Sequence, residues 1–256
     1  MKPLFPNTID LNCDMAELHP VNGSNNDAAI MPFISSCNVC CTYHSGSAEL
    51  SANTIRLAIQ NNVSVGAHPS YNDKANFGRI TPKVSLETLI EELRFQIGAI
   101  SKMASSLGTK LNHVKPHGAL YNDLAKDEKL SLAFIKVILD INPKLKIYGL
   151  ANSIFEKLCR DHDMNFVSEV FADRQYASAS KLVSRKKPNA VLSDTCDVLK
   201  QVDNLLSGKI IDINGNTHKV KAESICLHSD TPNAVALAQK IYEHIKSKDI
   251  AILPPQ

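Results

Sequence analysis

The sequence predicts an α/β fold in which parallel strands close into a barrel surrounded by helices. Short apolar stretches alternate with helical patterns along the 256 residues, as is typical of a parallel sheet covered by helices. Several stretches end at a His or Asp beside a small residue: Asp14, His44, His68, His117, Asp173 and His228. In β/α barrels such strand ends meet at one rim, where the chemistry takes place. This pattern indicates one shared polar mouth, and therefore an enzyme.

Several apolar stretches are short enough, and aliphatic enough, to be strands. They are Ile9–Cys13, Cys37–Tyr43, Val63–Ala67, Leu111–Lys115, Lys146–Leu150, Phe166–Phe171 and Ser224–Leu227. Another short apolar run, Ala190–Leu192, is a candidate extra strand.

Helical patterns separate these strands. They cover Ala48–Asn61, Leu86–Leu107, Lys129–Asp140, Ser153–Asp161, Cys196–Leu206 and Asn233–Lys246. In the longest pattern, apolar residues recur close to every 3.6 residues, and Gly108 is placed to end the helix. Such a stripe predicts one helix face packed against the sheet.

Two segments interrupt the alternation. Lys209–Val220 contains Asn214-Gly215 between alternating residues, which predicts a small β-hairpin inserted before the last barrel strand. Tyr71–Pro82 is a long loop after His68, and loops of that length at a catalytic rim often line the site. No linker or tandem repeat divides the chain, so we predict a single β/α-barrel domain over residues 1–256.

The composition is that of a globular protein and argues against two classes of partner. Hydrophobic residues make up 44% of the chain, charged residues 21%, and the net charge is only +2, which provides no basic field for nucleic acid. We interpret the run Arg185–Lys187 as a solvated loop. No stretch approaches the ~20 apolar residues of a membrane span, and the N-terminus lacks the apolar run of a signal peptide. We therefore expect a cytoplasmic protein with reduced cysteines that binds neither nucleic acid nor membrane.

Alternation along the strands sorts their side chains onto two faces. The polar sets are Asp10, Asn12 and Asp14 in the first strand, His113, Lys115 and His117 in the fourth, and Ser224, Cys226, His228 and Asp230 in the last. We expect the apolar faces to pack against the helices and the polar sets to point into the barrel. A polar interior is costly unless its groups pair with each other or bind a ligand. Pairing alone stays open for any single residue, but the whole set indicates binding.

A resident metal ion is not expected, although one ligand set stays open. His113 and His117 have the spacing of helical metal ligands, but Pro116 argues against a helix there. On a strand the two residues lie about 13 Å apart, too far for one ion. A site drawn from different strands remains an alternative: Asp14, His44, His68 and His117.

The clustered cysteines are interpreted as small buried residues. Cys37 and Cys40 face opposite sides of a strand and cannot share a zinc ion. A Cys41 thiolate stabilised by His44 is the alternative.

Anionic groups require cationic side chains, because the chain has no standard phosphate loop. Neither a Gly-x-x-x-x-Gly-Lys-Ser/Thr motif nor a strand-linked Gly-x-Gly-x-x-Gly motif occurs. Arg79, Lys115 and Arg174 are the candidates, since Arg suits planar carboxylate or phosphate and Lys acts as a point charge.

From Ile9 to about Pro232 the chain resembles the LamB/YcsF family, the A subunit of bacterial ATP-dependent 5-oxoprolinase. The shared segments are Asp10-Leu11-Asn12-Cys13-Asp14 with Glu17, Ser35-Ser36-Cys37-Asn38 leading to His44-Ser45-Gly46, Gly66-Ala67-His68-Pro69-Ser70, Phe77-Gly78-Arg79, His113-Val114-Lys115-Pro116-His117-Gly118 with Leu120-Tyr121-Asn122, Glu169-Val170-Phe171-Ala172-Asp173-Arg174, and Cys226-Leu227-His228. Their order along nearly the whole chain makes the resemblance specific.

The resemblance implies a seven-stranded β/α barrel similar to that of the polysaccharide deacetylases. It also implies opening of 5-oxo-L-proline (pyroglutamate) to L-glutamate, driven by ATP hydrolysis, in a complex with subunits B and C. ATP carried with Mg²⁺ is the implied co-substrate. A homo-oligomer stays open.

For that reaction, we expect the catalytic residues to be Asp14, Glu17, His68, Lys115, His117 and Asp173. The residues expected to bind substrate or phosphate are Asn12, His44, Arg79, Arg174, His228 and Asp230. A carboxylate, Asp14 or Glu17, is the candidate base for water, and an imidazole, His68 or His117, the candidate donor to the departing nitrogen. Lys115 and an arginine would clamp developing phosphate charge.

Three departures from the family pattern leave other functions open. Ala16 and Ser229 stand where the family usually has Gly, and Ser47 stands where it usually has Asp. Glycine at such positions supplies positive φ or close backbone approach, whereas Ser47 can still cap the following helix. One alternative is a non-catalytic binding subunit. The other is a metal-dependent amide hydrolase or deacetylase, suggested by the polar barrel.

Overall fold

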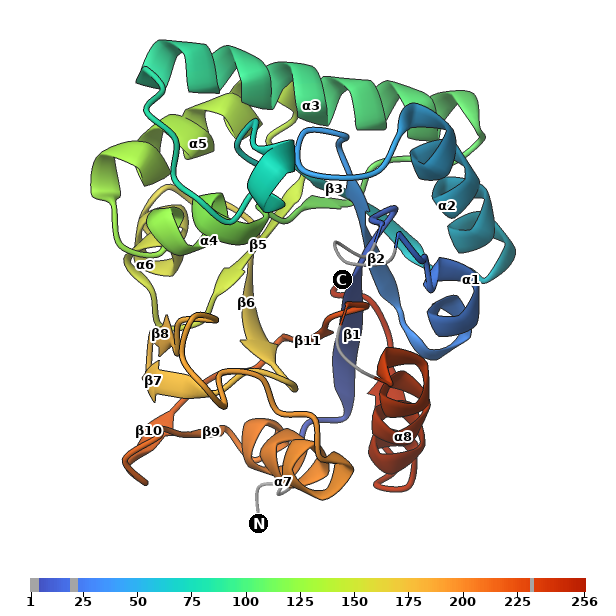
Figure 1. Ribbon diagram of the computed structural model, residues 1–256, viewed down its shortest axis with the longest axis vertical. Helices are drawn as coiled ribbons and strands as arrows, with labels where there is room; N and C mark the ends of the chain where they lie inside the picture. Colours follow the sequence, from blue (N-terminus) through green and yellow to red (C-terminus); the bar gives the residue numbers. More distant parts are fainter. Residues whose placement is uncertain (1–4, 19–22, 231–232) are drawn as a thin grey trace.

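A closed barrel of parallel strands forms the centre of the molecule, and helices surround it (Figure 1). The chain is known from a computed structural model that describes residues 5–18, 23–230 and 233–256. Within those residues the barrel strands are β1 (Thr8–Met15), β2 (Ser36–Cys40), β3 (Ser64–His68), β4 (His113–Val114), β5 (Lys146–Leu150), β6 (Phe166–Phe171) and β11 (Ser224–Leu227). β11 pairs with β1 and closes the barrel, while β12 (Ala251–Ile252) pairs with the start of β1 outside it. The predicted seven-stranded β/α barrel is confirmed.

Two strands are shorter than predicted, for local backbone reasons. β2 ends at Cys40, close to Thr42, whose φ of 68° turns the chain. β4 keeps only His113–Val114, because Pro116 has no N–H to continue the ladder. The backbone nevertheless follows β3, since the Lys115 and His117 N–H groups donate to the carbonyls of Ala67 and Pro69. The candidate strand at 190–192 is wrong, because Val191 forms only an isolated bridge.

Helices lie outside the barrel much as the apolar periodicity predicts. The longer ones are α2 (Ala48–Gln60), α3 (Leu86–Ser106), α5 (Glu128–Ile141), α6 (Ile154–Asp161), α7 (Thr195–Leu206) and α8 (Ala234–Lys246). Short elements missed by the sequence patterns are α1 (Asp27–Ile30), η1 (Met31–Phe33), η2 (Lys74–Asn76) and α4 (Gly118–Leu124). They are too short to show a helical period, yet α4 places His117 at its N-terminus.

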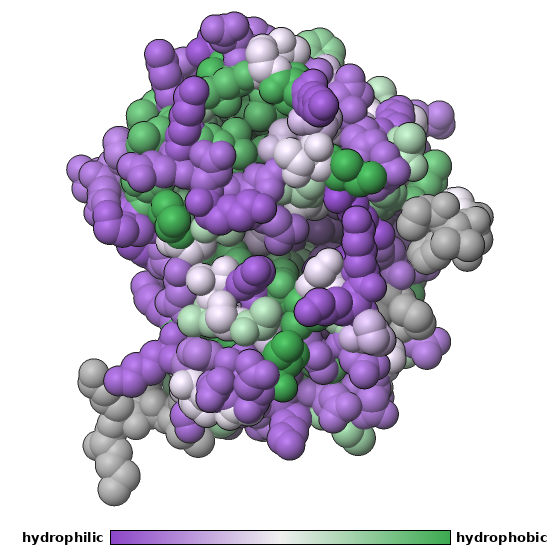
Figure 2. Space-filling model, turned by 60° about the vertical axis from the view of Figure 1, so that its left-hand side comes forward, coloured by the Kyte–Doolittle hydropathy of each residue, from purple (hydrophilic) through white to green (hydrophobic). Residues whose placement is uncertain are grey.

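In the part of the chain that the structure describes, two hairpins lie beside the barrel, and one of them was predicted. β9 (Lys209–Ile211) and β10 (Thr217–Lys219) form the expected hairpin, with Gly215 at a φ of 81° in its turn. β7 (Tyr176–Ser178) and β8 (Lys181–Leu182) form a second hairpin after β6. Figure 2 turns the side that carries β7, β8 and α6 toward the reader and shows a mostly hydrophilic face. Within the described ranges, none of the helices combines the length and the apolar content that a membrane-spanning segment requires.

The barrel interior is polar, whereas the space between strands and helices is apolar. On β1, Ile9, Leu11 and Cys13 belong to the buried apolar core. The Asp10 carboxylate points the other way and accepts hydrogen bonds from Ser35 at 2.7 Å and from Tyr148 at 3.0 Å. The two faces of β1 are thus separated as the alternation predicts.

The middle of the barrel contains a histidine that requires a glycine on the neighbouring strand. His113 is fully buried and its Nε2 lies 2.8 Å from the amide oxygen of Asn38. A Cβ atom on Gly66 would lie 2.0 Å from His113 Nε2. Gly66 therefore provides the room that the ring occupies.

Replacing Gly66 with Ala should lower the free energy of unfolding by about 1–3 kcal/mol, because the methyl group overpacks the His113 ring. The matched control is Gly98→Ala on the exposed face of α3, where an added Cβ meets nothing within 4 Å. That substitution should stabilise the helix by about 0.5–1 kcal/mol. Denaturant unfolding of both variants tests the pair, and equal shifts would contradict the steric explanation.

Candidate functional site

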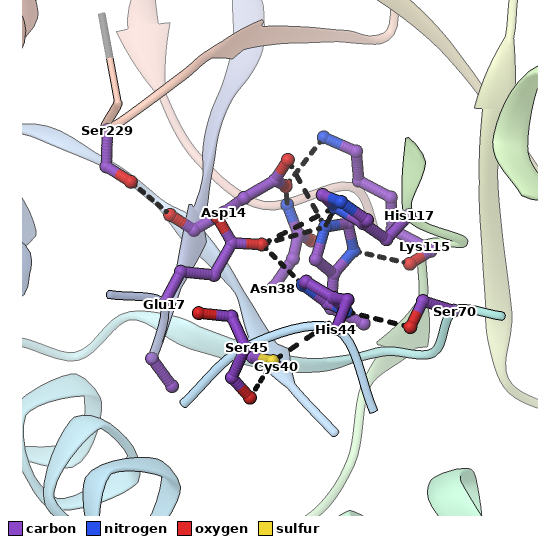
Figure 3. A network of polar contacts seen from close by, with 12 residues as sticks. Asp14, Glu17, Asn38, Cys40, His44, Ser45, Ser70, Lys115, His117 and Ser229 are labelled. Atoms are coloured by element: carbon purple, nitrogen blue, oxygen red, sulfur yellow. Dashed lines mark hydrogen bonds and ion pairs between the residues drawn. The ribbon is translucent and has the colours of Figure 1, made fainter. Parts of the chain in front are cut away.

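A cavity of about 930 Å³ opens at the carboxyl ends of the barrel strands. Asp14, Glu17, His68, Lys115 and His117 line its floor. Its walls come from α4, the loop after β3, the β7–β8 hairpin and the segments after β8 and β11. Figure 3 shows the carboxylates of Asp14 and Glu17 facing Lys115 and the imidazoles.

A buried ammonium group joins the floor to the strands around it. Lys115 Nζ lies 2.9 Å from Asp14 Oδ1 and 2.8 Å from Glu169 Oε1, and all three side chains are buried. It also contacts Asn12 Oδ1 at 3.1 Å and Cys226 Sγ at 3.0 Å. Because buried charges need partners, contacts with β1, β6 and β11 fix the Lys115 ammonium group inside the barrel.

Two imidazoles meet beside Asp14. His68 Nε2 lies 3.0 Å from His117 Nδ1 and 3.2 Å from Asp14 Oδ2. Each ring is fixed from behind by a backbone carbonyl, since His68 Nδ1 donates to Lys115 O at 2.6 Å and His117 Nε2 donates to Phe77 O at 2.9 Å. The nitrogens that face each other therefore have fixed positions at the cavity floor.

A carboxyl–imidazole pair lies next to them. Glu17 Oε1 is 2.7 Å from His44 Nε2, and the same oxygen is 3.4 Å from His117 Nδ1. His44 lies under the floor and stacks on His117, with ring centroids 3.7 Å apart. Its Nδ1 contacts Ser70 Oγ at 2.9 Å (Figure 3).

The surroundings of the acids and imidazoles shift their pKa values in different directions. Burial raises the pKa of a carboxyl, but His68 and Lys115 outweigh it and hold the pKa of Asp14 well below its usual range. Burial and nearby Asp14 raise the pKa of Glu17. For His68 the attraction of Asp14 outweighs burial and raises the pKa. Burial and the neighbouring imidazoles lower the pKa values of His44 and His117 well below the usual range.

Two further candidates pair with each other, and a ring nitrogen of one of them, His228, lies within 4.8 Å of an Asp14 carboxylate oxygen. Asp173 is fully buried behind His228, with Oδ1 2.9 Å from Nδ1 and Oδ2 accepting the His228 backbone N–H at 3.1 Å. His228 lines the cavity, whereas Asp173 does not. Asp173 thus orients His228. The adjacent Ser229 hydroxyl donates to the Asp14 carbonyl at 3.0 Å.

The upper wall is cationic and contains one arginine that the sequence pattern placed in solvent. Arg79 lies 2.5 Å from Asp230, and Arg185 lies 3.7 Å from the same carboxylate. Lys186 and Lys187 are exposed, as the interpretation of Arg185–Lys187 as a solvated loop predicts, whereas Arg185 is only partly exposed and lines the cavity together with Lys186. The reason is Arg174, which donates to the carbonyls of Val183 and Ala190 and holds their loop against the barrel. Burial and Arg185 lower the pKa of Arg174 to about 10.

The structure gathers most of the expected site residues around one cavity. Its lining includes Asp14, Glu17, His68, Arg79, Lys115, His117, Arg174, His228 and Asp230. Asn12, His44 and Asp173 are buried one layer below it. The sequence patterns missed Asn38, Ser70 and Glu169 as partners of the site, because each gains its role only through contacts between strands.

The acid and imidazole groups whose potential ligand atoms lie close together differ from the expected metal set in one residue. Glu17, His44, His68 and His117 each offer a ligand atom, and these atoms lie within 4.8 Å of one another. Glu17 thus takes the place expected for Asp14, which instead groups with Cys226 and His228. Cys37, Cys40 and Cys41 are free and buried, as predicted.

Two of the residues that depart from the family pattern, Ala16 and Ser47, still make the contacts that hold the local backbone. Ala16 adopts a φ of 59°, the left-handed conformation that glycine adopts without strain, and its N–H donates to Asp27 at 2.8 Å. Ser47 caps α2 by accepting from Leu50 N–H at 3.2 Å, as predicted. These contacts retain the loops around the cavity despite the departures from the family pattern.

Comparison with known proteins gives a consistent assignment. The family model described as "LamB/YcsF family" matches residues 9–256. The A subunit of 5-oxoprolinase from Bacillus mycoides (strain KBAB4) is 41% identical over 250 residues, covering 97% of this chain and 98% of that protein. A relative of the same name from Bacillus cereus (strain ATCC 14579) is 39% identical over 251 residues, covering 97% of this chain and 99% of that protein.

Solved structures agree on the fold. The lactam utilization protein from Thermus thermophilus superposes with a TM-score of 0.89 at 30% identity, covering 97% of this chain and 100% of that one. A family 4 carbohydrate esterase from Streptomyces lividans, at 12% identity and a TM-score of 0.52 over 98% of this chain and 100% of its own, shares the fold alone. With a family model matching nearly its whole length, the chain belongs to the LamB/YcsF family.

Proposed function

We propose that the chain is the A subunit of an ATP-dependent 5-oxoprolinase, which opens 5-oxo-L-proline to L-glutamate together with subunits B and C. The relatives named for that enzyme support this assignment. The observation that carries it is the convergence of an ionised carboxylate, imidazoles and cations on one cavity floor. An amide-opening reaction requires those groups together.

The reaction begins by activating a resonance-stabilised lactam. Transfer of the γ-phosphoryl group of ATP to the lactam oxygen releases ADP and makes the ring carbon electrophilic. Water then adds to that carbon and loses a proton to a base. The carbon–nitrogen bond breaks as the nitrogen takes a proton, giving γ-glutamyl phosphate, and a second water yields glutamate and phosphate. Mg²⁺ carried with ATP balances the phosphate charge.

Asp14 is the base that the geometry favours. Its carboxylate faces the cavity, and Lys115 at 2.9 Å and Asn38 at 2.8 Å fix one of its oxygens. The second oxygen contacts His68 at 3.2 Å. A carboxylate oriented in this way accepts a proton from a water held above the floor.

The His228–Asp173 pair is the favoured donor to the departing nitrogen. His68 and His117, the donors expected from the sequence, bond to each other and to backbone carbonyls. His228 lines the cavity, and Asp173 holds its Nδ1. This arrangement orients an imidazole toward the substrate, with Asp173 as its positioning residue.

The cationic wall is suited to the anionic parts of the two substrates. Arg79 and Arg185 share Asp230, so an incoming carboxylate or phosphate competes with that side chain for the arginines. Arg174 holds the loop that carries Arg185. Lys181 and Lys186 line the same wall.

The complex of this chain with subunits B and C should release glutamate from 5-oxoproline only when ATP is present. Release without ATP would favour an amide hydrolase instead. Tight 5-oxoproline binding without turnover, in the presence of both partners, would favour a non-catalytic binding subunit. Glutamate and ADP measured in the same reaction distinguish these outcomes.

Replacing Asp14 with Asn should reduce ATP-coupled ring opening by about 10²–10⁴-fold, because the base is lost. His117→Ala should abolish turnover as well, since it disrupts the floor beside Asp14. The matched control is Asp161→Asn on the exposed face of α6, which should retain activity. Thermal unfolding checks that each variant is folded. Full activity of both floor variants would overturn the assignment.

Arg185→Ala should raise KM for an anionic substrate by about 10–100-fold, the usual effect of losing a charged hydrogen bond. The neighbouring Lys187 is exposed and does not line the cavity, so Lys187→Ala is the control and should leave KM unchanged. Separate titrations of 5-oxoproline and ATP identify which anion the wall binds. Unchanged KM for both substrates in Arg185→Ala would contradict this role.

A further inference from the structure

We propose that His113 is a positioning residue of the site, which fixes the side-chain amide of Asn38 and through it holds the Asp14 carboxylate toward the cavity. His113 lies on β4, is fully buried and does not line the cavity. The inference rests on the proposed function, in which Asp14 is the base. It adds to that function the buried side chains that orient the base.

The charges at the cavity floor determine which way the buried amide of Asn12 points. An ammonium group can only donate, so the atom of Asn12 that lies 3.1 Å from Lys115 Nζ is the amide oxygen. The Asn12 nitrogen then donates to Glu169 Oε1 at 2.9 Å. Because the Asn12 oxygen can only accept, the atom of Asn38 that lies 2.8 Å from it is the amide nitrogen.

The same reasoning fixes the amide of Asn38. Its nitrogen donates to the Asn12 oxygen and to Asp14 Oδ1, each at 2.8 Å. An ionised carboxylate has no proton to donate, so Asp14 also requires the nitrogen on this side. The Asn38 oxygen therefore faces the other way, toward His113 Nε2 at 2.8 Å. An oxygen in that position requires a hydrogen on Nε2.

His113 meets this requirement as a neutral imidazole. Burial lowers its pKa to about 3, and the titratable groups that face the ring are Lys115, His68, Lys146 and Asp14. The ring therefore carries a single proton at neutral pH. Its Nδ1 has no hydrogen-bond partner among the described residues, whereas Nε2 faces the Asn38 oxygen. The proton belongs on Nε2, where it donates to Asn38.

The surroundings of His113 hold the ring in this position. Tyr148 packs against it, with ring centroids 4.2 Å apart and an angle of 30° between the ring planes. The Tyr148 hydroxyl donates to Asp10 Oδ2 at 3.0 Å, which fixes the phenol ring in turn. Gly66 on β3 leaves the space that the Nε2 end of the imidazole occupies. The donor to Asn38 thus has a fixed place in the barrel.

The consequence for Asp14 is that its two carboxylate oxygens have different surroundings. Oδ1 accepts from Asn38 at 2.8 Å and from Lys115 at 2.9 Å. Oδ2 lies beside His68 Nε2 at 3.2 Å. Without the His113 donor, the Asn38 amide is free to rotate, and an oxygen turned toward Asp14 would repel its charge. Since a hydrogen bond to the ionised form lowers the pKa of a carboxyl, losing the Asn38 donation raises it.

The first test determines the proton position on His113 in the full chain, without ATP, 5-oxoproline or partner subunits. In a ¹⁵N-labelled chain, the nitrogen chemical shifts of an imidazole distinguish its two neutral tautomers and its charged form. The signals of His113 are identified by their loss in His113→Gln. We expect a neutral ring with its proton on Nε2 at neutral pH. A charged ring, or a proton on Nδ1, would overturn the proposal.

The second test compares two substitutions of similar side-chain volume. His113→Leu removes the donor and should raise the pKa of Asp14 by about one unit, so that about 10-fold more of it is protonated at the same low pH. His113→Gln keeps an amide donor for Asn38 and should recover most of that shift. Carboxyl ¹³C NMR of the chain alone follows the titration. The charged groups around Asp14 stay unchanged in both variants: His68, Lys115, His228 and Glu17.

The control is His162→Leu at the exposed end of α6, which should leave the Asp14 titration as in wild type. An unchanged Asp14 titration in folded His113→Leu would refute the proposal. An equal rise in His113→Leu and His113→Gln would refute it as well, because altered packing would then be the cause. If His113→Leu does not fold, the proton position in the wild-type chain decides the question.

Ring opening by the complex with subunits B and C connects this effect to the proposed function. In His113→Leu the acid limb of kcat/KM should move up by about one pH unit, because protonated Asp14 cannot accept a proton from water. His113→Gln should recover most of that change. If the wild-type complex does not open the ring, the proposed function fails, while the titration still decides whether His113 positions Asp14. If the ring opens and Asp14 titrates alike in folded His113→Leu and wild type, the positioning role fails and the function stands.

Discussion

The need to pair one buried ammonium group organises the interior of this barrel. Lys115 Nζ contacts Asp14, Glu169, Asn12 and Cys226, which come from three strands other than its own segment. Removing charges from water is costly, so such a group persists only where its partners surround it. The closed, parallel arrangement supplies those partners, and the same contacts fix the Asp14 carboxylate at the cavity floor. Stability of the interior and orientation of the site thus have one cause.

The site above Lys115 consists of groups with opposite charge preferences. Asp14 and His68 favour their charged forms because each faces the other, while burial drives Glu17, His44 and His117 toward neutrality. Groups separated in this way can hold and transfer protons, which supports the proposed ring opening. The carbonyls and Ser70 that orient the rings keep these groups in place.

The loops that form the cavity walls add cationic side chains to the site. The loop after β3 brings Arg79, and the loop after β8 brings Arg185, so that two cations meet one carboxylate, Asp230. Arg174 supports this arrangement by donating to the backbone carbonyls of Val183 and Ala190, which hold the loop that carries Arg185. From the sequence, Arg174 was instead expected to bind an anion. The backbone at Ala16 and the cap at Ser47 show that the loops tolerate the departures from the family pattern.

Local periodicity and alternation along the chain were enough to predict the barrel, most of its strands and helices, and the polar faces of β1, β4 and β11. The sequence also identified the residues at the strand ends, since a parallel barrel brings such ends to one rim. Which side chains pair with one another could not be predicted in this way, because it depends on how the strands are arranged in space. Glu169, Ser70 and Arg185 gain their roles from partners that closure and register bring close. The β7–β8 hairpin and α4 are too short to carry a periodic signal, so their place in the cavity wall follows from packing alone.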